Sequence, residues 1–407
     1  MSDPRLPLLI VGASTRAAAH SALRGGWQPT WVDLYGDVDL VSVAQGVAAP
    51  DFPEGVVEGA AALSPAPWMY TGGMENHPQL VDQLSRGRPL WGNPGDVLQR
   101  IRDPWWIAAQ LRQVGLPVLD LWPAAVAPPP ADGSWLQKPL CGSGGRGISR
   151  WDESATPLDE TVYYQRRVEG KAYAAHFLAL PDQVLFLGGM RQLIGLSRVA
   201  APPFAWCGAL SPAELDTGTL ELMRSIGERL AREGPLLGLF GCDFIVDGEG
   251  TPWLTEVNPR YTGAMELLDH RWSVSLVGCQ AQACRGDLSD ASLDPGEERE
   301  ASAGPLGRLI SRLSVAGVQH RDRVLGKIVL FAERELWAHD ARNLLLDPLD
   351  DRFPFVADLP APGQKIAAGH PVCSLFAYDR TEALCLPRLV RCARMFRRRL
   401  STAAPDA

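Results

Sequence analysis

The sequence lacks the features that mark several large classes of protein. None of its apolar runs approaches the roughly 20 residues that a membrane-spanning helix needs. The opening Met-Ser-Asp-Pro-Arg lacks the pattern of a signal peptide. The eight cysteines form no Cys-x-x-Cys pair, so neither a zinc site nor a disulfide framework is suggested. We therefore expect a cytoplasmic protein without a membrane span.

Positive charge is also scarce. The formal net charge of −8 argues against a general nucleic-acid-binding protein. Only four of the 39 basic residues are lysines, so each lysine merits attention. What is present is ordinary: 407 residues, of which 46% are hydrophobic, are enough for two or three domains with cores of their own.

The stretch 236–260 has the pattern of a β-hairpin. Two apolar, β-rich runs flank the turn Gly248-Glu249-Gly250. If the last two residues of that turn form the tip, Asp243 lies opposite Glu256, with Cβ atoms roughly 4.5–5.5 Å apart. Asn258 then lies on the same face as Glu256, because side chains alternate along a strand. This pairing assumes a two-residue loop, and a bulge would shift it.

Two carboxylates and an amide oxygen on one apolar hairpin favour a bound cation. Like charges repel each other, and burial penalises both of them. Mg²⁺ takes oxygen ligands and usually completes its shell with water and substrate phosphates. Asp243, Glu256 and Asn258 are therefore candidate Mg²⁺ ligands. The alternative is a hairpin whose acidic side chains simply face water.

The N-terminal segment has the order of a Rossmann-like half-domain. The apolar run Leu6–Val11 is followed by Gly12, by a helix-like segment that ends at Gly25, and by a second strand at Thr30–Leu34. Of the glycines in the dinucleotide-binding fingerprint, only Gly12 is present. A parallel αβ layer that uses Gly12 for a tight turn is therefore favoured over a nicotinamide site.

A further buried strand is predicted at Trp68–Thr71. Glu75 and Asn76 follow it, in the kind of loop where open αβ sheets bind ligands, although a polar loop needs no such role. Two helices should come next, at about 94–101 and 104–114, since Gly115 and Pro117 are a normal C-terminal stop.

Lys138 ends a predicted strand, and a glycine-rich loop follows it. Gly142, Gly144, Gly145 and Gly147 occupy four of six positions, which permits backbone conformations that place several N–H groups around an anion. Lys138 would add a point charge for phosphate. The loop is not a P-loop, which needs Gly-Lys-Ser/Thr at its end. The alternative is a mobile hairpin tip without a ligand.

Three strands and a helix are predicted between this loop and the hairpin. The β-rich runs are 162–168, 172–180 and 183–188. Ser211-Pro212-Ala213-Glu214 has the pattern of a capping box with proline at the first helical position, and it predicts a helix to about Glu233.

The order of these parts over roughly residues 5–285 resembles the ATP-grasp superfamily. The resemblance implies an α/β (α+β) protein, with an ATP-grasp fold of two α+β subdomains and ATP and Mg²⁺ as cofactors. The implied domains are a Rossmann-like pre-ATP-grasp domain (1–100), a small lid subdomain (101–162), a catalytic subdomain (163–285), a small C-terminal β-rich domain (300–386) and a basic tail (387–407).

The resemblance also implies roles for individual residues. Lys138 would contact the nucleotide phosphates, and the lid loop would close over them. The hinge would meet adenine through its backbone, and Glu169 would lie near the ribose. The implied lid residues are Gly142, Ser143, Gly144, Gly145 and Gly147, and the implied hinge residues are Gln165, Arg166, Arg167 and Val168.

For catalysis, the resemblance implies Lys138 together with Arg260, a cation near the transferred phosphate. Asp243, Glu256 and Asn258 would hold Mg²⁺. One position departs from the family pattern, because many members carry a second phosphate lysine where this chain has Arg102-Asp103-Pro104. Either Arg102 substitutes for that lysine, or the contact is missing.

The implied activity is that of an ADP-forming carboxylate–amine ligase. ATP would phosphorylate a small-molecule carboxylate, and an amine or similar nucleophile would attack the acyl phosphate. The overall pattern is similar to ligases of one-carbon cofactor (methanofuran or methanopterin) synthesis. The alternatives are a regulatory or scaffold protein that binds ATP without catalysis, and another ATP-grasp reaction such as carboxylation. A homodimer is compatible with the sequence.

In the C-terminal third, a strand is predicted at 324–331, and the stretch 357–376 alternates short strands with Pro-Gly turns. This resembles the small β-barrel appendage of some ATP-grasp proteins, and without a Met-Lys-Met hairpin no swinging cofactor is expected. The segment 387–400 holds six arginines among apolar residues. It reads as a basic amphipathic tail for a membrane or partner, or as the more common solvated helix face.

Overall fold

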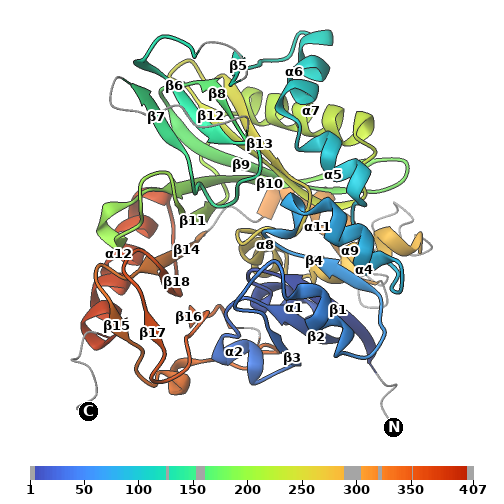
Figure 1. Cartoon of the computed structure of the whole chain (residues 1–407), viewed down its shortest axis with the longest axis vertical. Coiled ribbons are helices and arrows are strands. Elements are labelled where there is room, and N and C mark those ends of the chain that lie inside the picture. Colours follow the sequence, from blue (N-terminus) through green and yellow to red (C-terminus); the bar gives the residue numbers. More distant parts are fainter. Residues whose placement is uncertain are drawn as a thin grey trace.

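The computed structural model describes residues 5–124, 128–152, 161–287, 304–319, 323–350 and 352–400. Figure 1 shows an N-terminal unit in blue, a small sheet at the opposite end, and a long central sheet that continues into the C-terminal strands. The predicted linker from Arg285 to Pro305 lies largely outside the described residues.

The N-terminal unit is built on a parallel sheet with the strand order β3-β2-β1-β4. Its central strand is fully apolar and buried from Leu8 to Val11, as parallel strands covered on both faces require. The predicted strand–glycine–helix–strand opening is confirmed, although the second strand begins earlier, at Trp27. The elements are β1 (Leu6–Gly12), α1 (Arg16–Arg24), β2 (Trp27–Asp33), α2 (Val38–Val41), β3 (Gln45–Ala48), α3 (Val56–Ala61), β4 (Trp68–Tyr70), η1 (Met74–Asn76) and α4 (Pro78–Ser85).

The start of α1 is occupied by a carboxylate of the protein itself. Asp33 Oδ2 accepts hydrogen bonds from the backbone N–H (2.6 Å) and the hydroxyl (2.9 Å) of Thr15. These are donors that a dinucleotide phosphate would use at a helix N-terminus. Gly12 is needed for packing, because a Cβ there would lie 2.1 Å from Thr71 Oγ1. Both observations support the αβ layer over a nicotinamide site.

A small antiparallel sheet carries the glycine-rich loop at the tip of its β6–β7 hairpin. The strand order is β5-β8-β6-β7. The preceding helices fall where they were predicted, and Asp103 caps the second of them by accepting from Trp105 N–H at 2.9 Å. The elements are α5 (Gly95–Ile101), α6 (Pro104–Gln113), β5 (Leu121–Pro123), β6 (Asp132–Pro139), β7 (Ser149–Asp152) and β8 (Val162–Arg166).

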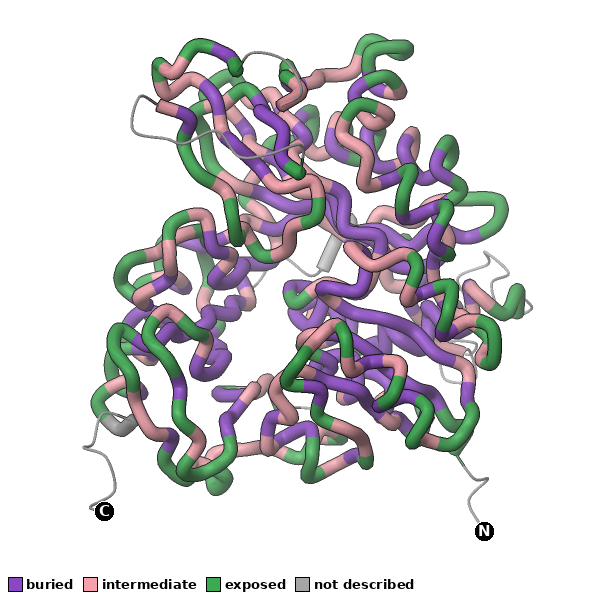
Figure 2. The backbone as a smooth tube through the Cα atoms, viewed as in Figure 1, coloured by how far each residue is buried: buried purple, intermediate pink, exposed green. Residues whose placement is uncertain are grey.

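The central sheet has eight strands in the order β13-β12-β9-β10-β11-β14-β18-β16. Buried Met223, Ile226 and Leu230 of α7 pack in one hydrophobic cluster with apolar side chains of β9 and β12. Figure 2 shows how continuous the burial is along these strands. The elements are β9 (Lys171–Ala179), β10 (Val184–Ile194), η2 (Ser197–Val199), β11 (Trp206–Ser211), α7 (Thr217–Glu233), β12 (Gly238–Val246), β13 (Pro252–Asn258), α8 (Met265–Trp272), α9 (Leu276–Arg285) and α11 (Pro305–Gln319).

The predicted capping box at residues 211–214 is wrong. Ser211 is the last residue of β11 and pairs with Leu325, so it cannot cap a helix. The helix begins instead at Thr217, where Asp216 accepts from Thr219 N–H at 2.9 Å.

Three of the C-terminal strands, β14, β18 and β16, extend the central sheet, because β14 pairs with both β11 and β18 and β16 pairs with β18. The other two, β15 and β17, pair with each other in a separate sheet of two strands. Helix α12 begins at Glu382, before the predicted tail, and its buried Leu389, Ala393 and Phe396 pack in the same hydrophobic cluster as residues of β14 and β18. The remaining elements are β14 (Val324–Phe331), β15 (Leu336–Trp337), η3 (Arg342–Leu344), β16 (Val356–Ala357), β17 (Lys365–Ile366), β18 (Pro371–Asp379) and α12 (Glu382–Leu400).

Candidate active site

The β12–β13 hairpin has the predicted pairing but not the predicted turn. Asp243 lies opposite Glu256, and Gly241 lies opposite Asn258. The loop is longer than two residues, since Val246 pairs with Pro252. A bulge between Asp243 and Phe244 shifts the register by one residue and offsets the longer loop. The longer loop and the bulge therefore offset each other, and Asp243 still pairs with Glu256.

The three predicted metal ligands gather at one place. Asn258 Nδ2 donates to Asp243 Oδ2 at 3.0 Å, and Gln192 Nε2 donates to Asp243 Oδ1 at 2.6 Å. Burial and the neighbouring Glu256 carboxylate raise the pKa of Asp243 to about 7. Within the described part of the chain, no group of three or more His, Cys, Asp or Glu residues is placed to hold a metal. The candidate donors are thus two carboxylates and one amide.

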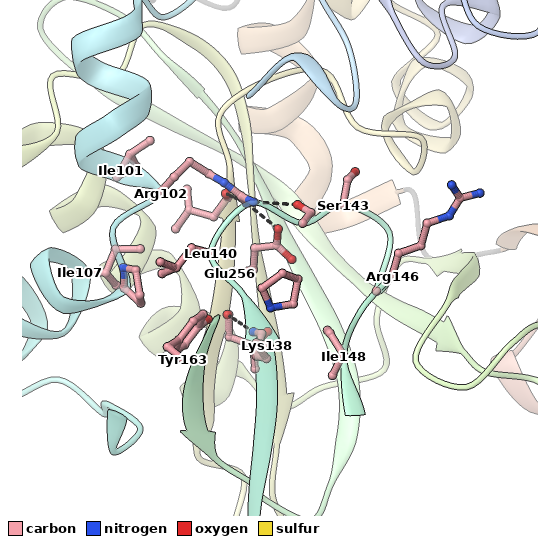
Figure 3. A pocket seen from close by; sticks show the side chains of 16 residues that line it. Ile101, Arg102, Ile107, Lys138, Leu140, Ser143, Arg146, Ile148, Tyr163 and Glu256 are labelled. Atoms are coloured by element: carbon pink, nitrogen blue, oxygen red, sulfur yellow. Dashed lines mark hydrogen bonds and ion pairs between the residues drawn. The ribbon is translucent and has the colours of Figure 1, made fainter. Parts of the chain in front are cut away.

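Lys138 lies beside the same hairpin. Its side chain is buried, and Nζ donates to Gln165 Oε1 at 3.1 Å and to the carbonyl of Thr255 at 2.9 Å. Thr255 precedes Glu256 on β13, so Lys138 of β6 contacts the residue next to this carboxylate (Figure 3). The predicted proximity of Lys138 to the acidic cluster is therefore seen.

The glycine-rich loop uses the conformations that only glycine adopts readily. Gly144, Gly145 and Gly147 have φ values of +63°, +81° and +77°. A Cβ at Gly145 would lie 1.9 Å from the carbonyl oxygen of Phe204, and Trp206 N–H donates to the Gly144 carbonyl at 3.2 Å. The loop tip thus packs against the segment that leads into β11.

A cavity of about 440 Å³ connects these features. It extends from the hinge after β8 to Ser14 and Thr71 at the carboxyl ends of β1 and β4. The sequence-predicted residues that line it are Lys138, Ser143, Gly144, Gly145, Gln165, Arg166, Arg167, Val168, Asp243, Glu256, Asn258 and Arg260.

Three predicted site residues do not line this cavity. Gly142 borders a smaller pocket of about 50 Å³ on the other side of Lys138 and Glu256 (Figure 3). Gly147 turns the loop back toward β7, against the ring of Pro139. The Glu169 side chain is mostly exposed and accepts from Arg167 Nη2 at 3.2 Å. A ribose contact by Glu169 would require that side chain to turn inward.

Comparison with known protein families identifies the domain that contains this site. The family model for the ATP-grasp domain matches residues 103–264, a segment that contains Lys138, the glycine-rich loop, the hinge and the metal-ligand candidates. Residues 103–264 of this chain are an ATP-grasp domain. The predicted resemblance and the mixed α/β fold are therefore both confirmed. No curated protein matches the sequence at a significant level.

Solved structures share this fold over nearly the whole chain. The L-amino acid ligase from Bacillus licheniformis has a TM-score of 0.67 at 14% identity, over 97% of this chain and 98% of that one. Carboxyaminoimidazole ribonucleotide synthase from Aspergillus clavatus, complexed with ATP, has a TM-score of 0.66 at 13% identity, over 98% and 100%.

The match to Rhizobium etli pyruvate carboxylase has a TM-score of 0.67 at 14% identity and covers 96% of this chain. This chain spans only 37% of that carboxylase. At such identities the likeness establishes the fold. None of the described helices is long and apolar enough to cross a membrane.

Sequence reasoning missed several residues that line the ATP-grasp cavity. His176 and Gln192 come from adjacent strands, β9 and β10, and burial lowers the pKa of His176 to about 4. Lys327 comes from β14 in the C-terminal part. Lys327 could have been suspected, since it is one of only four lysines. Nothing in the local sequence marks the other two.

Glu75 and Asn76 take supporting positions. Glu75 Oε1 accepts from Arg260 Nη2 at 2.7 Å, and Asn258 Oδ1 accepts from the same nitrogen at 3.1 Å. Burial opposes ionisation of Glu75, but the Arg260 guanidinium outweighs it and lowers the pKa of that carboxyl. Neither residue of the loop lines the large cavity. Glu75 therefore orients Arg260, while Asn76 donates from Nδ2 to the Gly142 carbonyl at 3.2 Å.

Proposed function

We propose that this ATP-grasp protein is an ATP- and Mg²⁺-dependent ligase of the cytoplasm. It activates a small-molecule carboxylate as an acyl phosphate for attack by an amine or similar nucleophile, and it releases ADP and phosphate. The observation that supports this proposal is the single cavity in which Lys138, the glycine-rich loop, the hinge and three oxygen donors meet.

In this proposal the nucleotide lies between the small sheet and the central sheet. Its adenine meets the backbone of residues 165–168, and its phosphates lie toward Lys138 and the glycine-rich loop. Lys138 is suited to this role because Nζ is a compact point charge, already oriented by Gln165 and by the Thr255 carbonyl.

Asp243, Glu256 and Asn258 would hold Mg²⁺. The donor set fits this ion, because carboxylate and amide oxygens are its usual ligands and the two opposed carboxylates need a counter-charge. When bound, Mg²⁺ would neutralise charge on the phosphates during transfer.

Beyond the metal, this chain's own side chains would contribute by positioning the reacting groups and stabilising their charge. Phosphoryl transfer needs little covalent help from the protein. Arg260, oriented by Glu75 and Asn258, would stabilise charge on the transferred phosphoryl group. The glycine-rich loop, packed against Phe204 and Trp206, would keep water from the acyl phosphate.

The names of two structural relatives agree with this class of reaction, since one is an L-amino acid ligase and another is a ribonucleotide synthase complexed with ATP. A non-catalytic scaffold is less consistent with the site, because all three predicted donors, Lys138 and Arg260 are present. Within the ligase class, we propose that pterin carboxylates of one-carbon cofactor synthesis are among the first substrates to test.

The experiment is a screen for ADP and phosphate release with the full-length protein, ATP and Mg²⁺. Panels of amino acids, amines and pterin carboxylates are supplied singly and in pairs. We expect release to rise at least roughly tenfold when the correct carboxylate and nucleophile are both present. If the protein binds ATP tightly but no pair stimulates release of ADP and phosphate, the result would contradict the ligase and support a regulatory protein. Turnover that depends on bicarbonate would indicate a carboxylase instead.

A further inference from the structure

Arg102 stands where the resemblance to the ATP-grasp superfamily implies a second phosphate lysine, but its side chain contacts other groups of the protein. The residue lies between α5 and α6, and its side chain is 12% exposed. Nη1 donates to a carboxylate oxygen of Glu256 and to the carbonyl of Val257, the latter at 3.1 Å. Nη2 donates to the Gly142 carbonyl at 2.8 Å and to Asn76 Oδ1 at 3.0 Å. Figure 3 shows the guanidinium between Glu256 and the glycine-rich loop.

The contacts of Arg102 follow from its place beside an edge of the central sheet. β13 is the edge strand of the central sheet, so its outward carbonyls have no partner strand. Lys138 Nζ satisfies the carbonyl of Thr255, and Arg102 Nη1 satisfies that of Val257. The two cations therefore bracket Glu256 on the same edge.

These contacts leave the guanidinium little capacity for a phosphate. Both terminal nitrogens already have two acceptors each, and only Nε lacks a partner. A planar guanidinium can hold four acceptors in fixed directions, which a lysine ammonium cannot do. Arginine at this position thus suits a multi-point clamp better than a point charge for phosphate.

We propose that Arg102 is a positioning residue that couples closure of the glycine-rich loop to the orientation of the Glu256 carboxylate. One guanidinium holds the loop at Gly142, the carboxylate at Glu256 and the N-terminal unit at Asn76. When the loop is closed, the guanidinium fixes the direction of the Glu256 carboxylate, which would hold Mg²⁺ in the proposed function. This inference rests on the proposed function for the meaning of that role, but the clamp itself is a property of the protein without nucleotide.

The test compares Arg102→Gln with Arg100→Gln, a matched change at an exposed arginine of α5, the helix that ends just before Arg102. Amide hydrogen exchange of residues 140–147 is measured first without nucleotide. We expect exchange to rise roughly tenfold in Arg102→Gln and to stay unchanged in Arg100→Gln, because charged hydrogen bonds to the loop are lost. Arg102→Lys should not restore protection, since one ammonium cannot span Glu256 and Gly142 together.

Steady-state kinetics give the second readout. We expect kcat to fall roughly tenfold in Arg102→Gln, with the KM for ATP changed less than about threefold. Asn76→Ala, which removes one arm of the clamp, should raise loop exchange in the same direction by a smaller factor.

Two results would contradict the proposed role of Arg102. One is loop exchange in Arg102→Gln equal to that in Arg100→Gln. The other is a tenfold rise in the KM for ATP at unchanged kcat, which would identify Arg102 as a phosphate contact. If the unmodified protein turns over no ATP with any substrate pair, the proposed function fails, while the exchange measurement without nucleotide still decides whether the clamp exists.

Discussion

Glu256→Gln should reduce ATP-dependent turnover by roughly 10²- to 10³-fold, which is the usual cost of losing one charge-stabilising group in an active site. Glutamine keeps the size of the side chain and an oxygen that can still accept from Arg102. It removes the negative charge that, together with Asp243, would bind the cation. The expected loss is therefore electrostatic, and the fold should be retained.

The matched control is Glu249→Gln, which makes the same change at the exposed tip of the same hairpin. Turnover of this variant should equal that of the unmodified protein. Steady-state rates at saturating ATP and Mg²⁺, with circular dichroism to check folding, provide the comparison. Full turnover by Glu256→Gln would show that the assignment of Glu256 as a metal ligand is wrong.

Arg16→Met should lower the free energy of unfolding by about 3–5 kcal/mol, because it leaves buried carboxylates without their main counter-charge. Arg16 is 1% exposed and pairs with both carboxylate oxygens of Glu266. Its Nε donates to Asp358 at 2.8 Å and lies 3.4 Å from Asp39. Lys327 Nζ also contacts Glu266, at 2.7 Å. This cluster joins α1 and α2 of the N-terminal unit to α8 and to the C-terminal strands.

The pKa values show how strongly the cluster depends on its cations. Burial alone would raise the pKa of the Asp358 carboxyl, but Arg16 and Lys327 lower it to about 2. Urea denaturation followed by tryptophan fluorescence would measure the effect, with Arg86→Met at an exposed site as the control. Adding Glu266→Gln to Arg16→Met should recover part of the loss, since one unpaired charge is removed. A change below about 1 kcal/mol in the single variant would contradict the account.

The local parts of the site could be predicted because short-range rules govern them. Alternation along β12 and β13 places Asp243, Glu256 and Asn258 together. Positive φ values at Gly144, Gly145 and Gly147 confirm that the loop needs its glycines. The predicted two-residue turn was wrong, and the pairing held only because the bulge compensated for the longer loop.

The tertiary parts could not be predicted, because nothing local encodes them. Arg16 and Glu266 meet across 250 residues of sequence, and Arg102 reaches Glu256 across 154. The capping-box prediction failed because Ser211 pairs with Leu325 in the ladder between β11 and β14. This long-range pairing overrides the local helix signal. The C-terminal strands look like an independent module in the sequence, but the same ladder makes β14, β18 and β16 part of the central sheet, and only β15 and β17 form a sheet of their own.

The most direct test of the metal site is a crystal structure with Mn²⁺ and a non-hydrolysable ATP analogue, in which anomalous scattering locates the ion. The account predicts an anomalous peak within roughly 2.0–2.5 Å of oxygens from Asp243, Glu256 or Asn258, with the analogue's phosphates beside Lys138. A peak elsewhere, or a nucleotide bound away from Lys138, would contradict it.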